Sequence, residues 1–375
     1  MKIGVNGYEA VIPRFGYDKN TGLPLRVGSA EFAFRLIKEF AKEKSHNFFI
    51  YTPVEPSKDL PRETNSFKYI VFKSKKLWTM LGLSKKIYKD KNNLDVFFSP
   101  THYLPLFSVV PSVVSIFDLS YLKYPELFKK KDLYQLKIWG RYSIKRAKAV
   151  ITISESSKNA IIEEYKLASD KVHVVYPGIK ELINNREINM TDLQKKYGIK
   201  KNFILFVGTI QPRKNIARMV EAISQIPELE LIVVGKKGWQ YEGILDSPRK
   251  FGVENRVKFL EFVPDEELSE LYKNAICFVL PSLYEGFGLP ILEAMKYGCP
   301  VVTSNTSSLP EAGGDAALYF DPEDSSDIAE KIKKLLSDDK LREDMIEKGY
   351  KQAKKFSWEK AAKETLHVLK EVANA

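Results

Sequence analysis

Two glutamates, Glu285 and Glu293, stand eight positions apart and flank a glycine-rich turn. They belong to the run PSLYEGFGLPILEA, which starts at Pro281 directly after an apolar stretch. If a helix begins near Leu289, its first free amides point back toward residues 286–288, a place suited to phosphate or sugar oxygens. We expect Glu293 to accept hydrogen bonds from two ribose hydroxyls and Glu285 to accept them from sugar hydroxyls. A glycine turn with one capping and one solvated carboxylate is the structural alternative.

Two cations, Arg213 and Lys214, follow a second apolar stretch at residues 203–207. Gly208 and Thr209 lie between, and a glycine there lets a ligand approach the backbone closely. The planar guanidinium fork and the ammonium point charge both suit a diphosphate. The alternative, a solvated helix start, explains the pair less well, because cations there oppose the helix dipole unless an anion is bound.

These segments resemble the retaining glycosyltransferases of family 4, whose glutamate-x7-glutamate motif matches Glu285 and Glu293. Residues 231–235 are similar to the next strand of that family, and residues 304–317 to the segment after the motif helix. The resemblance is dense over residues 200–360 and looser before them. It implies the GT-B architecture, an α/β fold of two facing Rossmann-like domains with parallel sheets and an interdomain cleft. It also implies an enzyme, a hexosyltransferase that moves a sugar from a nucleotide diphosphate to an acceptor.

The resemblance assigns roles residue by residue. Arg213 and Lys214 would stabilise negative charge on the departing diphosphate, and Glu285 would act at the sugar end of the donor. A donor phosphate oxygen would take the acceptor proton on one face of the sugar, so no strong protein base is required. The implied donor-binding residues are Gly28, Gly208, Thr209, Gly235, Gly286, Phe287, Gly288, Leu289 and Glu293.

The first half of the chain holds two further candidates. Gly28 precedes a helix pattern that starts at Ser29 and resembles the glycine loop of the family, although a turn glycine with a serine cap accounts for it equally well. Where many relatives carry His-Asp-Leu after a strand, this chain has Phe117, Asp118 and Leu119. Asp118 is the candidate catalytic residue nearest the acceptor, and an aspartate capping the next turn is the alternative. Phe117 in place of the histidine leaves open whether activity is lowered or redirected.

The sequence contains no Asp-x-Asp pair, which fits a site that holds phosphate with cations. We therefore expect no metal, and no cofactor besides the nucleotide-sugar substrate. Residues 120–126 and the overall pattern look most like mannosyltransferases of surface polysaccharide or lipid-linked glycan biosynthesis. The expected donor is therefore GDP-mannose, and the expected acceptor is a glycan or a lipid-linked glycan.

Short apolar runs alternate with longer helical patterns along the chain, which is typical of parallel sheets built from strand-helix-strand units. The strands expected in the first series are Lys2–Asn6, Asn47–Thr52, Lys68–Phe72, Asp95–Ser99, Ser112–Phe117, Ala149–Ser154 and Val172–Tyr176. Those expected in the second series are Phe203–Val207, Glu230–Val234, Val257–Leu260, Ile276–Leu280, Pro300–Ser304 and Ala317–Phe320. Helices are expected at Ser29–Glu43, Leu133–Arg146 and Trp358–Val372.

A polar stretch between Gly178 and Met190 separates the two series. It predicts an acceptor-side domain at 1–180 and a nucleotide-sugar-binding domain at 181–357. On the resemblance, the helix at 358–375 crosses back to the first domain.

The composition, 44% hydrophobic and 29% charged over 375 residues, is that of a soluble globular protein of two domains. No stretch approaches the roughly 20 apolar residues of a membrane span, and Met1 runs directly into a strand pattern with no signal peptide. We therefore expect a cytoplasmic enzyme. Cys277 and Cys299 sit in apolar runs and are expected to be reduced core thiols.

Basic residues are concentrated in the first half of the chain. Residues 1–180 hold 31 Lys and Arg against 17 Asp and Glu, so they carry a net charge of +14, whereas the remainder is at −3. Residues 68–91 hold eight lysines against the single acid Asp90, interleaved with Trp78 and several leucines. This pattern predicts peripheral contact with an anionic membrane surface through Lys75, Lys76, Trp78, Lys85 and Lys86. A solvated helix between two strands is the alternative, and Gly82 would weaken a long amphipathic helix.

Other classes of protein share parts of this pattern. A dehydrogenase is disfavoured because no Gly-x-Gly-x-x-Gly follows the first strand of either series. Nucleic-acid binding is not expected, because no recognised module is present. A nucleotide-sugar epimerase of the same architecture and a non-catalytic nucleotide-sugar-binding protein remain open.

Overall fold

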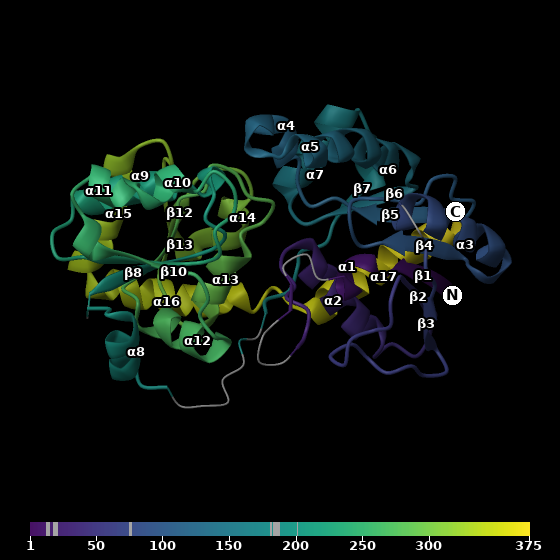
Figure 1. Cartoon of the computed structure of the whole chain (residues 1–375), viewed down its shortest axis with the longest axis horizontal. Helices are drawn as coiled ribbons and strands as arrows, with labels where there is room; N and C mark the ends of the chain where they lie inside the picture. Colours follow the sequence, from purple (N-terminus) through teal and green to yellow (C-terminus); the bar gives the residue numbers. More distant parts are fainter. Residues whose placement is uncertain (13–15, 18–21, 75–76, 181, 183–187, 201) are drawn as a thin grey trace. The chain divides into compact units, whose positions relative to one another are not determined.

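The structure is a computed structural model that describes residues 1–12, 16–17, 22–74, 77–180, 182, 188–200 and 202–375. The chain forms two compact units, each built around its own parallel sheet (Figure 1). The N-terminal unit comprises Met1–Gly178 and Ser357–Ala375, and the C-terminal unit comprises Ile179–Phe356. The predicted boundaries, after residues 180 and 357, lie two residues and one residue from these positions.

The N-terminal unit contains a seven-stranded sheet in the order β3-β2-β1-β4-β5-β6-β7, in which every neighbouring pair is parallel. Parallel neighbours need crossover connections, and helices provide most of these. Strands β4, β5 and β6 are buried at every residue, as expected for strands covered on both faces. The strands are β1 Lys2–Asn6, β2 Asn47–Thr52, β3 Phe67–Val71, β4 Val96–Ser99, β5 Ser112–Ser115, β6 Ala149–Thr152 and β7 Val172–Val174.

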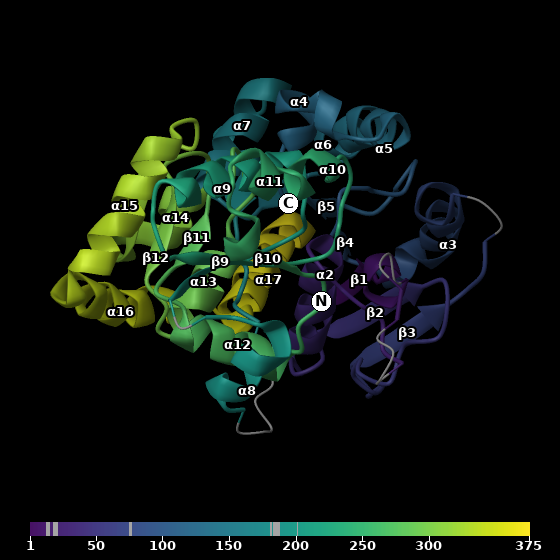
Figure 2. The ribbon, with the colours of Figure 1, turned by 60° about the vertical axis from the view of Figure 1, so that its left-hand side comes forward.

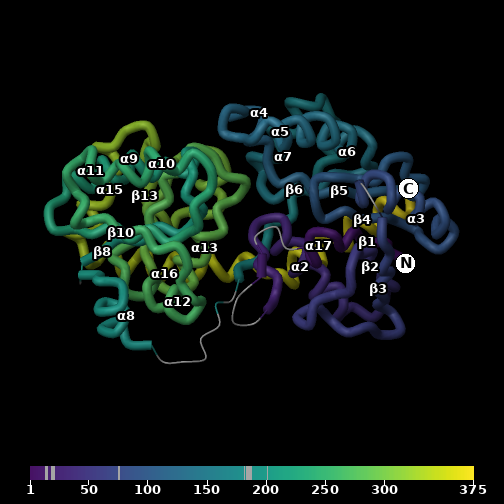
Figure 3. The backbone as a smooth tube through the Cα atoms, in the orientation of Figure 1, coloured from purple at the N-terminus to yellow at the C-terminus, as the bar shows by residue number. Residues whose placement is uncertain are grey.

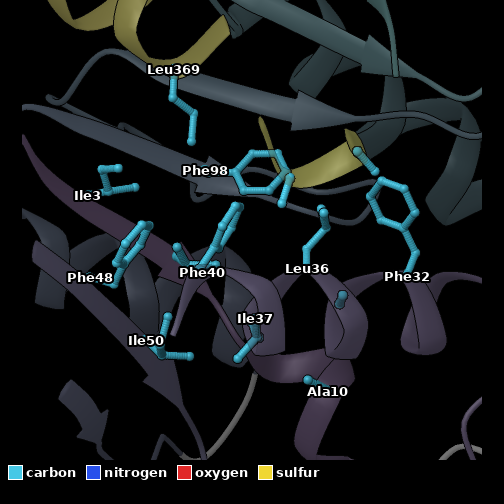
Figure 4. Close-up of a cluster of buried hydrophobic side chains, with 14 of the residues drawn as sticks. Ile3, Ala10, Phe32, Leu36, Ile37, Phe40, Phe48, Ile50, Phe98 and Leu369 are labelled. Atoms are coloured by element: carbon cyan, nitrogen blue, oxygen red, sulfur yellow. The ribbon is translucent and has the colours of Figure 1, made fainter. Parts of the chain in front are cut away.

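Helices cover both faces of this sheet. Its α-helices are α1 Tyr8–Val11, α2 Ser29–Phe40, α3 Leu83–Asp90, α4 Ser120–Lys123, α5 Lys130–Gln135, α6 Arg141–Arg146, α7 Glu155–Tyr165 and α17 Trp358–Asn374. One core cluster joins α1, α2 and α17 to the sheet, in which Phe40 of α2 packs against Phe98 of β4 and Phe32 of α2 packs against Trp358 of α17 (Figure 4). A second cluster packs α3, α6 and α7 on the opposite face, through residues such as Ile87, Ile144 and Ile161. The chain's last helix, α17, therefore belongs to the core of its first unit, beside α2 (Figure 3).

The C-terminal unit contains a six-stranded parallel sheet in the order β10-β9-β8-β11-β12-β13. Its strands are β8 Phe203–Val207, β9 Glu230–Val234, β10 Val257–Leu260, β11 Phe278–Leu280, β12 Val301–Ser304 and β13 Ala317–Phe320. Its α-helices are α8 Met190–Tyr197, α9 Ile216–Ser224, α10 Glu242–Leu245, α11 Ser247–Lys250, α12 Asp265–Asn274, α13 Leu289–Lys296, α14 Leu309–Gly313, α15 Ser325–Ser337 and α16 Asp339–Ala353. Helices α9, α11 and α15 lie on one face of the sheet, and α12, α13 and α16 lie on the other (Figures 1 and 2).

Several predicted elements differ from the observed ones at their ends. The predicted strand at residues 112–117 ends at Ser115, the one at 149–154 ends at Thr152, and the one at 172–176 ends at Val174. Apolar residues continue past these ends, but the length of a strand depends on its neighbours in the sheet, which the sequence does not reveal. The helix predicted at residues 133–146 begins at Lys130 and contains a π-helical turn at Leu136–Gly140. None of the helices in the described parts of the chain combines the length and apolar character needed to cross a membrane.

The lysine-rich segment after β3 folds as a π-helical turn, η1 Trp78–Gly82, that leads directly into α3. Trp78 is only 7% exposed, because its ring stacks on Phe72 at 4.8 Å and lies 5.6 Å from the ring of Tyr8. Its indole Nε1 donates a hydrogen bond to the carbonyl of Phe72 at 3.0 Å. The prediction that Trp78 contacts a membrane is therefore wrong, since its apolar ring belongs to the core.

The lysines predicted to contact a membrane differ from one another in their surroundings. Lys86 pairs with Asp90 at 3.0 Å, whereas Lys85 is exposed. Lys75 and Lys76 lie outside the described residues.

Candidate active site

The C-terminal sheet changes winding direction at β8. Strands β9 and β10 lie on one side of β8, and β11, β12 and β13 lie on the other. In folds of this kind, ligands bind beyond the carboxyl ends of the two strands at such a switch point. The segment from Gly208 to Lys214 leaves β8 at this end, and the segment from Pro281 to Gly288 leaves β11. The tertiary structure thus brings the two predicted motifs to one edge of the sheet.

Gly208 and Gly235 lie against each other at the ends of β8 and β9. A Cβ atom on Gly235 would stand 1.8 Å from the carbonyl oxygen of Gly208, so no side chain fits there. The amide of Gly208 donates to the carbonyl of Val234 at 2.9 Å, and Thr209 follows, half-buried. Close backbone packing is sufficient reason for glycine at position 235, and the donor-binding roles of these three residues stay predictions.

Arg213, Lys214 and Glu285 form one ion-paired cluster. The Arg213 guanidinium lies 3.1 Å from one carboxylate oxygen of Glu285, and the Lys214 ammonium donates to the other oxygen. The guanidinium also donates to the carbonyl of Tyr284. The main chains are joined as well, because the amide of Leu283 donates to the carbonyl of Arg213 at 3.0 Å.

Glu285 is charged despite being only 8% exposed. Burial by itself would raise the pKa of this carboxyl, but Lys214 and then Arg213 hold the pKa at about 2. A carboxylate with so low a pKa does not take up a proton near neutrality, so Glu285 is unsuited to act as a general base or acid there. It instead fixes two cations at the end of the sheet.

The loop that carries Glu285 is held by two serines that the sequence analysis did not single out. The amide of Glu285 donates to the hydroxyl of Ser307 at 3.0 Å, and the hydroxyl of Ser308 donates to the carbonyl of Glu285 at 2.9 Å. Ser307 has φ +53°, which is uncommon for a residue with a side chain. Its separation of 22 residues from Glu285 explains why no local pattern pointed to this contact.

Helix α13 begins at Leu289, as the sequence predicts. Gly288 precedes it with φ +106° and has no side chain with which to cap the helix. The ring of Phe287 is buried edge-on against Phe356 at 5.4 Å, so any donor contact of Phe287 has to come from its backbone. Gly286 is buried in the same turn, and Leu289 is half-buried.

Glu293 is half-buried one turn into α13, close to the hydroxyl of Tyr272 in α12. Burial and then the Glu293 carboxylate raise the pKa of Tyr272 well above its usual value. Tyr272 therefore stays a neutral donor that can orient this carboxylate. A ribose-binding role for Glu293 remains a prediction.

The other two candidate segments lie in the N-terminal unit. Gly28 has φ +55° and ψ −121°, and a Cβ atom there would meet no described atom within 4 Å. The carboxylate of Asp118 accepts a hydrogen bond from the amide of Ser120 at 2.8 Å, so it caps the turn that starts α4. Its half-buried neighbour Phe117 packs against Phe32 and His102, with ring centroids 5.0 and 5.3 Å apart. Among the described residues, no group of three or more His, Cys, Asp or Glu side chains could hold a metal ion.

A doubly wound parallel sheet in each of two units is the architecture of the GT-B class of proteins, and the second unit carries cations and a carboxylate at its switch point. The solved structure of the Anabaena protein HepE in complex with UDP-glucose has this fold; it matches 98% of this chain and 100% of its own at a TM-score of 0.72 and 19% identity. The predicted α/β GT-B fold class is therefore confirmed.

Comparison of sequences identifies the family. Residues 27–181 match Glycosyltransferase Family 4, and residues 189–352 match Glycosyl transferases group 1. The O-antigen chain mannosyltransferase B of Escherichia coli is 34% identical over 290 residues, which cover 76% of this chain and 75% of that protein. The serotype-specific mannosyltransferase WbdA of Escherichia coli is 35% identical over 227 residues, which cover 58% of this chain but only 28% of that longer protein. The chain belongs to the group 1, family 4 glycosyltransferases, as the sequence motifs predict.

Proposed function

We propose that this glycosyltransferase is a metal-independent, retaining mannosyltransferase that uses GDP-mannose. Its proposed acceptor is a glycan or a lipid-linked glycan of surface polysaccharide biosynthesis, and the enzyme would meet it at a membrane surface. The name of the 34% identical relative, an O-antigen chain mannosyltransferase, supports the sugar and the acceptor class. A UDP-glucose complex of a protein with the same fold supports a nucleotide-sugar donor.

The cluster of Arg213, Lys214 and Glu285 carries this proposal. Glu285 binds both cations at the carboxyl ends of β8 and β11, which is where folds of this kind bind the phosphates of a nucleotide. In the proposed reaction, the bond from the sugar C1 to the diphosphate oxygen breaks and a bond from C1 to the acceptor oxygen forms on the same face. The acceptor proton passes to the diphosphate. Arg213 and Lys214 stabilise the charge that develops on the leaving group, and Glu285 keeps both cations in place.

A thermal-shift panel of nucleotide sugars tests the donor. A ligand present at about 100 times its dissociation constant stabilises the folded protein by roughly 2.7 kcal/mol, so GDP-mannose should raise the Tm more than UDP-glucose does. A larger shift with UDP-glucose would overturn the choice of donor. Conversion of the donor in the absence of acceptor would instead identify an epimerase, and binding without turnover on glycan acceptors would identify a binding protein.

Metal independence has a separate test. If Arg213 and Lys214 supply the positive charge, transfer should proceed at an unchanged rate in EDTA. A requirement for added Mg²⁺ or Mn²⁺ would show that transfer depends on a metal ion, and the cationic mechanism would then be wrong.

A further inference from the structure

The loop between β4 and β5 exposes a phenylalanine that is held outward by its backbone. Phe107 is 76% exposed and has φ +57°. That region of backbone conformation costs of order 1–3 kcal/mol for a residue with a side chain, so it persists only when its surroundings impose it. The observed conformation therefore presents this apolar ring to solvent at a cost in backbone energy.

Three hydrogen bonds from three elements hold the loop. The amide of Leu106 donates to the carbonyl of Met80 in η1 at 3.0 Å, and the Ser84 hydroxyl of α3 donates to the carbonyl of Leu106. The amide of Phe107 donates to the hydroxyl of Tyr142 in α6 at 3.1 Å. Phe107 is thus fixed beside α3.

Tyr88 and two lysines line a hollow together with Phe107, and two exposed apolar residues lie near these residues in the chain. A hollow of about 320 Å³ is lined by Ser84, Lys85, Tyr88, Lys89 and Phe107. Leu81 lies one turn before Lys85, and Val109 lies two residues after Phe107; both side chains are exposed. We call these residues the Phe107 surface: Leu81, Lys85, Tyr88, Lys89, Phe107 and Val109.

The charge of this surface is positive and uncompensated within the described residues. No carboxylate of a described residue pairs with Lys85 or Lys89. The neighbouring Asp90 is bonded to Lys86 and to the hydroxyl of Tyr51. Exposed apolar side chains bordered by unpaired cations are complementary to a surface with a hydrocarbon layer beneath anionic groups. The net charge of +14 over residues 1–180 adds long-range attraction to such a surface.

We propose that the Phe107 surface docks this enzyme on an anionic lipid bilayer, with Phe107 inserted among the lipids and Lys85 and Lys89 at the headgroups. This inference deepens the proposed function, because it places the contact with the membrane that a lipid-linked acceptor requires. The membrane contact predicted from the sequence had Trp78 as its apolar anchor. In the present proposal the anchor is Phe107, because Trp78 is buried.

Flotation of the full-length protein with vesicles tests the proposal without donor or acceptor, so its outcome does not depend on the identity of the sugar. Wild-type protein should bind phosphatidylglycerol-containing vesicles in low salt, bind pure phosphatidylcholine vesicles far less, and be released as salt rises. Phe107→Ser should weaken binding at least tenfold, because it removes the inserted apolar group. The matched control is Phe262→Ser, which removes a 54% exposed phenylalanine from the C-terminal unit and should bind like wild type.

The lysines are tested in the same assay. Each lysine near an anionic bilayer contributes about fivefold in affinity, so Lys85→Gln with Lys89→Gln should reduce binding roughly 30-fold. Lys333→Gln with Lys334→Gln, two exposed lysines of α15, makes the same change in net charge elsewhere and should have little effect.

A probe at position 107 reports insertion directly. Cys277 and Cys299 are buried, so a maleimide fluorophore on Phe107→Cys labels one site. Its emission should shift to the blue on anionic vesicles, whereas a label on Phe262→Cys should not respond. The proposal is overturned if wild type shows no preference for anionic vesicles, or if the Phe107 and Phe262 variants behave alike. It is also overturned if the wild-type protein is a dimer that Phe107→Ser dissociates, because the surface then joins two copies of the chain.

Discussion

At the scale of single residues, the candidate site depends on charges that are fixed before any ligand binds. Lys214 and Glu285 are both less than a tenth exposed, and Arg213 is half-buried. A buried ion pair contributes little stability relative to an apolar pair of the same size, because desolvation offsets the attraction between the charges, although removal of one partner destabilises the fold. Its value here is geometric, since the carboxylate holds two cations where a diphosphate would lie.

Substitution of the cations should damage turnover more than folding. Arg213→Ala and Lys214→Ala should each lower kcat by roughly 10² to 10³, the loss typical of a preorganised group that stabilises developing charge. Isothermal titration should show weaker binding of the nucleoside diphosphate and nearly unchanged binding of the plain nucleoside. Glu293→Gln provides the contrast, because loss of a ribose contact should weaken the binding of both the nucleoside diphosphate and the nucleoside by roughly 1.5–3 kcal/mol. Equal losses for both ligands in the Arg213 and Lys214 variants would assign those residues to the fold.

The low pKa of Glu285 predicts a defined dependence of stability on pH. Because its folded pKa, about 2, lies below the ordinary value of 4.5, the ionised carboxylate stabilises the fold fully above about pH 5. That contribution is lost progressively as pH falls from 4.5 toward 2. Glu285→Gln should therefore lower the urea midpoint by the same amount at pH 7 and pH 6, and by a smaller amount at pH 3. A difference that is as large at pH 3 as at pH 7 would contradict the assignment.

At the scale of elements, a glycine directly precedes each of two helices that follow a loop predicted to bind the donor. Gly28 precedes α2 and Gly288 precedes α13, both with positive φ, and neither glycine has a side chain with which to cap its helix. Their surroundings differ, because a Cβ on Gly288 would lie 2.8 Å from the Leu309 side chain, whereas a Cβ on Gly28 would meet no described atom within 4 Å. At Gly28, the positive φ is sufficient reason for glycine, and no described atom adds a steric one.

Gly28→Ala isolates this backbone requirement. It should destabilise the N-terminal unit by about 1–3 kcal/mol, because alanine is strained at this φ and ψ. Gly243→Ala within α10 is the control, since a Cβ there also meets nothing within 4 Å and alanine favours a helix. Urea unfolding should show a lower free energy of unfolding for Gly28→Ala and a higher one for Gly243→Ala. Equal changes in the two variants would mean that backbone strain at Gly28 is negligible.

At the scale of the whole molecule, the order of segments in the chain differs from their order in space. Helix α17 follows the entire C-terminal unit but supplies Trp358, Ala361, Val368 and Leu369 to the core of the N-terminal unit. That core is incomplete until the last residues of the chain are in place. Gly178 ends the first segment of this unit and lies directly against the start of α17. A Cβ atom on Gly178 would lie 2.2 Å from the backbone nitrogen of Trp358.

Leu369→Ala should therefore loosen the first unit through a change near the end of the chain. The side chain is fully buried, and its truncation should cost about 2–5 kcal/mol. Hydrogen exchange should accelerate in peptides from β4 and β5 and stay unchanged in peptides from β8 and β9. Lys370→Ala changes the exposed neighbour and should leave both sets unchanged. If the two variants behaved alike, α17 would not stabilise the N-terminal core.

The sequence by itself determined the class of fold, most strand positions and the two motifs of the candidate site. Strands such as Phe203–Val207 and Glu230–Val234 were predicted with their observed ends, because each is an apolar run closed by a local turn signal. The start of α13 was predictable for the same reason, since a Gly-x-Gly turn followed by Leu-Pro is a local pattern.

Only the tertiary structure decided which residues meet. Glu285 pairs with Arg213 and Lys214 across 72 and 71 positions, and no pattern within either segment specifies that contact. It also decided that Trp78 is buried while Phe107 is exposed, although both lie in apolar surroundings in the sequence. Hydrophobicity predicts that a residue favours burial, but the packing of η1, α3 and the loop before β5 determines which side chain finds room inside.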